Sequence, residues 1–232
     1  SFAISVDSGD GYRYMASFFE MLAERYTRKD GKYGFAGAYI IGNGANSSLD
    51  DDRTLSERAS SYGKLLRIAS FALRSKYANG KVFVSIDNKW NLQNEEGVTE
   101  ESIENPALPI AQRAAFGGAE FLTALKKNLE SIGFYDYGVA LIPSSHEDDS
   151  DITNDALARE ARDTEFVTFK NLSVVREHIG EDTELILYRF EISSEDEAAM
   201  ARSYAYAYGM ALKNGATAFI YNGQWDRATG NR

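Results

Sequence analysis

The sequence has no cysteine among its 232 residues, and this absence excludes disulfides, thiolate metal sites and a cysteine nucleophile. No apolar run approaches the roughly 20 residues that a membrane-spanning helix needs, so we expect no membrane span. A chain without cysteine fits a reducing cytoplasm or an exported bacterial enzyme equally well. Between these compartments we favour a secreted or cell-surface bacterial protein over a cytoplasmic one.

Clusters of positive charge are also missing. The formal net charge is −10 and the sequence pI is about 4.8, and the basic residues are scattered along the expected helices. Because such a chain repels a phosphate backbone, nucleic acid is not an expected partner. The acidic stretches at 50–52 and 147–151 lack the alternating spacing and closing glutamate of an EF-hand loop. We therefore predict solvated loops there, no metal site and no cofactor.

Short apolar runs alternate regularly with longer helical patterns. Six runs rich in strand-forming residues occupy 2–6, 37–41, 81–86, 137–142, 184–190 and 217–221. Most are continuously apolar, as expected for parallel strands that are buried on both faces. Helical spacing follows the first two runs, at Tyr14, Phe18, Leu22 and Tyr26 and then at Leu55, Ala59, Tyr62, Leu66, Ala69 and Leu73. The alternation predicts one α/β domain over residues 1–232, built on a parallel sheet.

Two parallel architectures compete for this pattern. A doubly wound, Rossmann-type fold places a G-x-G-x-x-G turn after its first strand. The segment Asp7-Ser8-Gly9-Asp10-Gly11 does not supply that turn, and Gly42-Asn43-Gly44 lacks the third glycine. A TIM barrel, (β/α)8, closes with eight strands, and about six βα units are present. We favour a TIM-barrel-like parallel barrel that is incomplete or a fragment, with the open Rossmann sheet as the alternative.

Several segments resemble those of one protein family. They are Leu22-Ala-Glu-Arg-Tyr26, Gly37-Ala-Tyr-Ile-Ile-Gly-Asn-Gly-Ala-Asn46, Val82-Phe-Val-Ser-Ile-Asp-Asn-Lys-Trp90, Thr164-Glu-Phe-Val-Thr-Phe-Lys-Asn171, Tyr204-Ala-Tyr-Ala-Tyr208 and Ala218-Phe-Ile-Tyr221. In order and in pattern they resemble a bacterial family of uncharacterised, glycosidase-like TIM barrels of the glycoside hydrolase superfamily. The resemblance implies that residue 1 lies near the third barrel strand. It also implies that the first two strands and the last helix lie outside this sequence.

The same resemblance places reactive groups where this chain has none. The family pattern ends its fourth strand with Asn-Glu, and the position of that glutamate is occupied by Gly44. The second carboxylate, at the end of the seventh strand, is replaced by Arg189. The family's His-Pro-Tyr-Pro turn after the sixth strand is replaced by Ile142-Pro143-Ser144-Ser145. The resemblance therefore implies a pseudoenzyme whose active-site motifs are degenerate.

Acidic residues at other strand ends keep a second interpretation open. Glycoside hydrolysis needs one carboxyl group as acid and a second as nucleophile or base. Because side chains alternate along a strand, Leu187, Arg189 and Glu191 would share one face, so Glu191 could form a relocated catalytic pair with Asp87 or Asp226. A simpler interpretation is that Arg189 neutralises one of these acids in a structural ion pair.

Aromatic and amide side chains after the expected strands suit a sugar ligand. Indole rings stack on the apolar faces of sugars, and amides and guanidinium groups bind their hydroxyl groups. The predicted binding residues are Asn43, Asn46, Asn88, Trp90, Arg189, Asn222, Gln224 and Trp225. Alternatively, both tryptophans pack beneath loops, as large aromatic residues commonly do.

Three functional hypotheses follow from the sequence. The first is a carbohydrate-related, glycoside-hydrolase-like barrel with weakened or absent hydrolysis, which still binds a carbohydrate ligand. The second is an active glycosidase that uses the relocated carboxylates. The third is a structural or partner-binding domain whose missing strands are supplied by another segment or chain, because an unclosed barrel leaves sheet edges exposed. A Ser-His-Asp site at Ser144 or Ser145 with His146 is rejected, since no G-x-S-x-G elbow accompanies it.

Overall fold

The computed structural model describes residues 6–47, 53–91, 116–143, 160–190 and 197–222. Within these ranges five strands form one parallel sheet in the order β1-β2-β3-β4-β5. They are β1 (Ala38–Ile41), β2 (Lys81–Ile86), β3 (Gly138–Leu141), β4 (Leu185–Phe190) and β5 (Ala216–Tyr221). Neighbours in the sheet are thus neighbours along the chain. This order excludes the doubly wound arrangement, in which the strand order reverses at a switch point.

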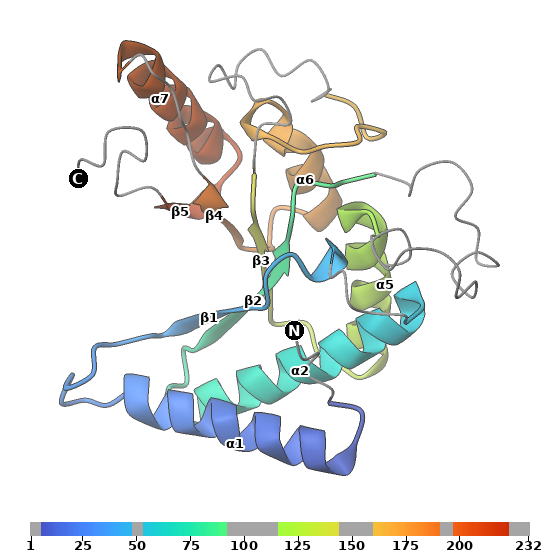
Figure 1. The fold of residues 1–232 in the computed structure, drawn as a ribbon, viewed down its shortest axis with the longest axis vertical. Coiled ribbons are helices and arrows are strands. Elements are labelled where there is room, and N and C mark those ends of the chain that lie inside the picture. The colour runs from blue at the N-terminus through green and yellow to red at the C-terminus, as the bar shows by residue number, and fades with distance from the viewer. Residues whose placement is uncertain (1–5, 48–52, 92–115, 144–159, 191–196, 223–232) are drawn as a thin grey trace.

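Helices alternate with the strands, and the sheet curls into half of a barrel (Figure 1). The α-helices of the described part are α1 (Gly9–Tyr26), α2 (Leu55–Lys76), α5 (Gly118–Ser131), α6 (Leu172–Ile179) and α7 (Glu197–Lys213). Two short 3-10 helices, η1 (Ala45–Ser47) and η2 (Phe169–Asn171), follow β1 and precede α6. None of the described helices is long and apolar enough to cross a bilayer.

The apolar core lies on both sides of the sheet. Along β2, Val82, Val84 and Ile86 belong to the large cluster that the helices cover, whereas Phe83 belongs to a smaller cluster. That smaller cluster also contains Ala140, Ile186 and Tyr188, and it fills the inner, concave face of the sheet. Strands buried on both faces explain why the sequence is continuously apolar there.

The sequence predicts five of these strands to within one residue at each end, and the TIM-barrel-like α/β class is confirmed. The remaining predicted strand, the first along the chain at 2–6, lies outside the described residues except for Val6, which is buried in the main core. The helical pattern of α2 is confirmed, since Ala59, Leu66, Ala69 and Leu73 are all buried.

The predicted buried stripe of α1 is wrong in part. Tyr14 is 76% exposed and Phe18 is 46% exposed, while Phe19 and Ala23 are the buried residues of this helix. The spacing of the stripe is helical, but the stripe is covered only in part: Leu22 packs against the main core, whereas Tyr14 and Phe18 are exposed.

Candidate functional site

The loops that follow β1 and β2 are joined by Asp87 and Asn46. Asn46 Nδ2 donates to Asp87 Oδ1 at 2.6 Å, and the Asp87 backbone N–H donates to Asn46 Oδ1 at 3.0 Å. The Lys89 backbone N–H donates to Asp87 Oδ1 at 3.0 Å, and the Ser47 hydroxyl donates to Asp87 Oδ2. Both carboxylate oxygens therefore accept hydrogen bonds from the protein itself.

Asn46 is fully buried and its amide group is occupied within the protein. Besides Asp87, its Nδ2 donates to the carbonyls of Lys89 and Phe116 at 3.3 and 3.2 Å. The backbone carbonyl of Asn46 accepts a hydrogen bond from Arg58 Nη1 at 3.2 Å. These contacts hold η1 against the end of β2, and they leave the amide of Asn46 turned into the protein.

Gly44 lies just after β1 and packs directly on Asp87. Its φ of 63° is in the left-handed region, which residues with a side chain rarely adopt. A Cβ at this position would lie 3.3 Å from the Cβ of Asp87. The backbone here is thus shaped for glycine, at the position where the family resemblance places a glutamate.

Ser85 and Tyr188 form a polar pair on the inner face of the sheet that sequence analysis missed. Their hydroxyl oxygens are 2.5 Å apart, and Ser85 Oγ also accepts from the Gly44 backbone N–H at 2.6 Å. Both residues are buried, and burial raises the pKa of Tyr188. A signal for Ser85 was present, because it lies two residues before Asp87 and so shares its face of β2.

The end of β4 departs from a regular strand at Arg189. Tyr188 pairs with Ile220 and Phe190 pairs with Tyr221, so Arg189 is an extra residue in the register, and its φ is 54°. Leu187 and Phe190 consequently belong to the same helix-side cluster. The expectation that Leu187 and Arg189 share a face by strict alternation is wrong, because the bulge interrupts the two-residue period. Arg189 itself is exposed.

Trp90 is buried, only 2% exposed. Its backbone N–H donates to the Glu165 carbonyl at 2.7 Å, and Lys89 forms an antiparallel bridge with Phe166. Its indole meets the His178 ring edge to face, with centroids 5.2 Å apart. Trp90 therefore packs inside the protein, as the second interpretation of the tryptophans expected. Its ring offers no open face for stacking on a sugar.

His178 lies late in α6 and is exposed, although its ring also contacts neighbouring side chains. Besides its contact with Trp90, the ring lies 3.4 Å from the Thr123 hydroxyl. Burial, with the Lys126 ammonium nearby, lowers the pKa of His178. It borders a cavity of about 430 Å³ between α5 and α6, which is on the helical wall and not at the carboxyl ends of the strands.

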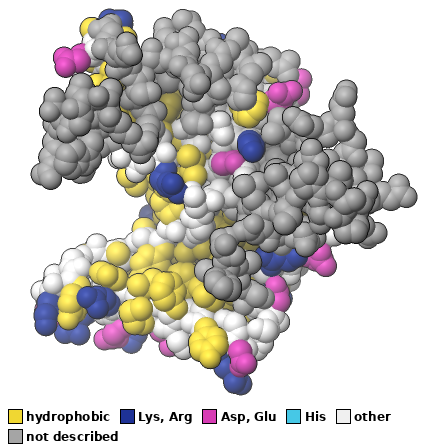
Figure 2. Space-filling model, viewed as in Figure 1, with side chains coloured by type: hydrophobic (Ala, Val, Ile, Leu, Met, Phe, Trp, Pro, Cys, Tyr) yellow, Lys and Arg dark blue, Asp and Glu magenta, His cyan; other side chains and the backbone are white. Residues whose placement is uncertain are grey.

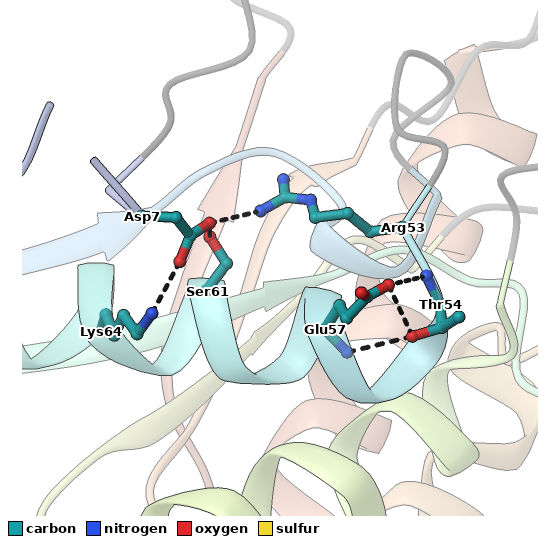
Figure 3. A network of polar contacts seen from close by, with 6 residues as sticks. All are labelled: Asp7, Arg53, Thr54, Glu57, Ser61 and Lys64. Atoms are coloured by element: carbon teal, nitrogen blue, oxygen red, sulfur yellow. Dashed lines mark hydrogen bonds and ion pairs between the residues drawn. The ribbon is translucent and has the colours of Figure 1, made fainter.

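Asp7, which follows the first predicted strand, is hydrogen-bonded to side chains of α2 (Figure 3). Lys64 Nζ donates to Asp7 Oδ1 at 2.7 Å, and the Ser61 hydroxyl donates to Oδ2 at 2.8 Å. These two hydrogen bonds lower the pKa of Asp7. Ser61 and Lys64 thus join the segment before α1 to α2. Helix α2 itself begins with a capping box between Thr54 and Glu57.

Other predicted binding residues lie at strand ends with more open side chains. Asn43 after β1 and Asn222 after β5 are exposed, and Asn88 after β2 is half-buried. Together with Arg189 they line the carboxyl edge of the half-barrel. Glu191, Asp226, Gln224 and Trp225 lie outside the described residues, and their roles stay predictions. Among the described residues, no group of three or more His, Asp or Glu side chains is placed to hold a metal ion.

Comparison with known proteins gives one family and several solved structures of similar fold. Residues 1–231 match a family described as "Family of unknown function (DUF5722)", whereas no curated protein matches the chain in sequence. A trimodular GH5_4 subfamily endoglucanase has a TM-score of 0.56 at 10% identity, covering 98% of this chain and 40% of that chain. Cel44A, a family 44 endoglucanase from Clostridium thermocellum, has 0.55 at 14% identity, covering 90% and 46%. A glucosidase from Croceicoccus marinus has 0.54 at 13% identity, covering 94% and 38%.

At such low identity these likenesses show the fold alone. The chain spans less than half the length of each of these three structures. The fold that they share is the α/β barrel of glycoside hydrolases, and the five described strands form part of it.

Proposed function

Because the chain belongs to the DUF5722 family of unknown function and shares its fold with glycoside hydrolases, we propose that it is a carbohydrate-binding barrel whose hydrolysis is weak or absent. Its ligand is a saccharide that lies across the carboxyl ends of β1, β4 and β5. Fold alone does not assign an activity, so the proposal depends on the chemistry of those strand ends.

One observation carries the loss of hydrolysis. A glycosidase keeps two carboxyl groups about 5 Å apart, or about 6.5–9.5 Å apart when a water lies between them. The ends of β1 and β4, where the resemblance places these groups, carry Gly44 and Arg189 instead. The nearby acids Asp7 and Asp87 are already hydrogen-bonded to groups of the protein. This arrangement favours a barrel that lacks the paired-carboxylate mechanism.

The exposed polar side chains support the binding half of the proposal. Asn43, Arg189 and Asn222 are exposed residues that carry amide and guanidinium groups at three different strand ends. Such groups donate to sugar hydroxyls in several directions at once, and the rigid sheet fixes their spacing. Arg189 is held in a bulge, which directs its side chain independently of the strand alternation.

Titration calorimetry against a panel of oligosaccharides tests the binding, with turnover of aryl glycosides measured in parallel. We expect Arg189→Ala to weaken binding at least about tenfold, the loss of about 1.4 kcal/mol that one charge-assisted hydrogen bond contributes. Arg74→Ala is the matched control, because Arg74 lies in the last turn of α2 at the opposite end of the sheet.

Two results would contradict the proposal. The first is equal affinity in wild-type protein and the Arg189→Ala variant. The second is glycoside turnover that the Glu191→Gln variant abolishes, because it would establish the alternative of an active glycosidase with Glu191 paired to Asp87 or Asp226.

A further inference from the structure

The helical wall of the half-barrel is not uniformly closed. Hydrophobic side chains lie at the surface over α1 and between α1 and β1 (Figure 2). Between α5 and α6, the wall is hollowed into the cavity of about 430 Å³ that His178 borders. Small-molecule sites in proteins commonly measure about 300–1,000 Å³. Because this cavity lies on the wall and not at the carboxyl ends of the strands, a ligand in it is independent of the saccharide proposed above.

The floor of the cavity is apolar and firmly packed. It consists of Leu122 from α5, Phe134 from the following loop and Val139 from β3, all of which are buried. The ring of Phe134 stacks on that of Tyr137, with centroids 6.3 Å apart and an angle of 10° between the planes. It also meets the ring of Phe71 edge to face at 6.5 Å. The floor is therefore formed before a ligand binds, which lowers the entropic cost of binding.

The rim of the cavity carries charge from a single turn of α5. Lys126, Lys127 and Glu130 all line the cavity and are exposed. None of the ion pairs in the described part of the chain includes any of the three. Among the lining residues, two ammonium groups thus stand against one carboxylate. In a chain with a net charge of −10, this local excess of positive charge attracts an anion.

Tyr137 adds a neutral donor to the wall of the cavity. Its side chain is half-buried and lines the cavity, and its hydroxyl takes part in none of the hydrogen bonds found within the described ranges. Burial and the nearby Glu130 carboxylate raise the pKa of Tyr137, so the hydroxyl keeps its proton. It is available to donate a hydrogen bond to a ligand.

We propose that the cavity between α5 and α6 binds a small carboxylate with an aromatic body. The aromatic body lies on the apolar floor, and the carboxylate accepts hydrogen bonds from the ammonium groups of Lys126 and Lys127, with the Tyr137 hydroxyl as a further donor. A neutral sugar is a poorer occupant, because the floor would leave its hydroxyl groups without partners.

Titration calorimetry with 3-phenylpropanoate and with 3-phenylpropanol, its neutral counterpart, tests the proposal. We expect the carboxylate to bind at least about tenfold more tightly than the alcohol, because hydrogen bonds to charged groups are the stronger ones. The double variant Lys126→Gln/Lys127→Gln should remove at least about tenfold of the affinity for the carboxylate and less than about twofold of that for the alcohol. Lys29→Gln/Lys213→Gln removes the same charge from two exposed positions elsewhere and is the matched control.

Two further variants locate the ligand. Thr123 is an exposed residue of α5 that lines the cavity, so Thr123→Trp fills the cavity and should abolish binding of 3-phenylpropanoate. Tyr137→Phe keeps the ring and removes only the hydroxyl, and it should weaken binding about threefold or more.

Each other outcome overturns the proposal. Absence of binding at millimolar concentrations of 3-phenylpropanoate would show that the cavity does not accept such a ligand. Equal affinity for the acid and the alcohol would show that the rim does not select a carboxylate. Equal losses in the two double variants would show that net charge, and not this cavity, attracts the anion. Binding that survives Thr123→Trp would place the ligand elsewhere. None of these results bears on saccharide binding at the strand ends, which is tested with Arg189→Ala.

Discussion

Asn46 and Asp87 bind each other reciprocally: the side-chain amide of Asn46 donates to the Asp87 carboxylate, and the Asp87 backbone N–H donates to the Asn46 amide oxygen. Forty-one residues separate them in sequence, so this pair joins the loop after β1 to the end of β2. An acid engaged in this way orders the carboxyl edge of the sheet, because both of its oxygens already accept hydrogen bonds from the protein.

The Asp87→Asn variant should therefore lose stability. An amide cannot accept from Asn46, Ser47 and the Lys89 backbone together, and one of its own donors would face them. We expect a decrease of about 1–3 kcal/mol in the free energy of unfolding, measured by urea denaturation. The exposed Asp182→Asn is the control and should change it by less than about 0.5 kcal/mol. Unchanged stability with lost glycoside turnover would instead assign Asp87 a catalytic role.

Replacing Gly44 tests the shape of the adjacent backbone. Alanine at a φ of 63° places a Cβ 3.3 Å from that of Asp87, and the left-handed conformation alone costs about 1–2 kcal/mol. Gly209→Ala is the control, because Gly209 lies inside α7 with open space around it. That change should stabilise the protein by about 0.5–1 kcal/mol. Denaturation curves of Gly44→Ala that overlay those of the wild type would refute the strained geometry.

The sequence specified the strands well because each is a continuous apolar run between helices, and burial on both faces leaves little ambiguity. It specified α2 equally well, since Ala59, Leu66 and Leu73 face the sheet of this same chain. The apolar stripe of α1 is buried only in part, since Leu22 packs on the main core while Tyr14 is exposed. Periodicity identifies an apolar face, but it does not say which surface covers that face, and Phe18 remains open within the described residues.

The candidate site was harder to predict because it depends on contacts between distant segments. Residues 89 and 90 pair with Glu165 and Phe166, about 75 residues further along the chain. No local sequence pattern predicts this long-range pairing. The bulge at Arg189 adds one residue to β4, and a strict two-residue period cannot detect it. Residue types at strand ends indicated where polar groups gather, but not which of them were already engaged.

Arg176 provides a test of the packing between α6, α7 and β5. Its buried guanidinium donates to four carbonyls: Nε to Asn214 at 2.9 Å, Nη1 to Gly180 and Thr183 at 2.9 and 2.8 Å, and Nη2 to Gly215 at 3.1 Å. The Arg176→Met variant leaves these acceptors without their donor, and we expect a loss of about 2–4 kcal/mol.

Calorimetric unfolding of the Arg176→Lys variant separates charge from geometry. Lysine keeps the charge but cannot reach four carbonyls with one ammonium group, so it should restore less than half of the loss. Full recovery with lysine would show that the charge alone matters at this position. Arg74→Met, which breaks only the exposed pair with Asp136, should cost less than about 1 kcal/mol.

His178 should make the stability depend on pH in the mildly acidic range. Burial and Lys126 lower its pKa from the ordinary value of 6.5, so the folded protein binds this proton more weakly than the unfolded chain does. The free energy of unfolding should then be highest above pH 6.5, fall as the pH drops below it, and level off below the folded pKa. Asp7 contributes separately and at lower pH, because its pKa is lowered from 3.8.

Urea denaturation between about pH 5 and 8, the range in which histidine titrates, measures this dependence. The His178→Gln variant should lose part of the slope that the wild type shows below pH 6.5, because glutamine cannot take up the proton. His146→Gln removes the second of the two histidines and controls for any titration elsewhere. If the slopes of the wild type and of His178→Gln coincide, partial desolvation and Lys126 do not lower the pKa of His178 enough to affect stability.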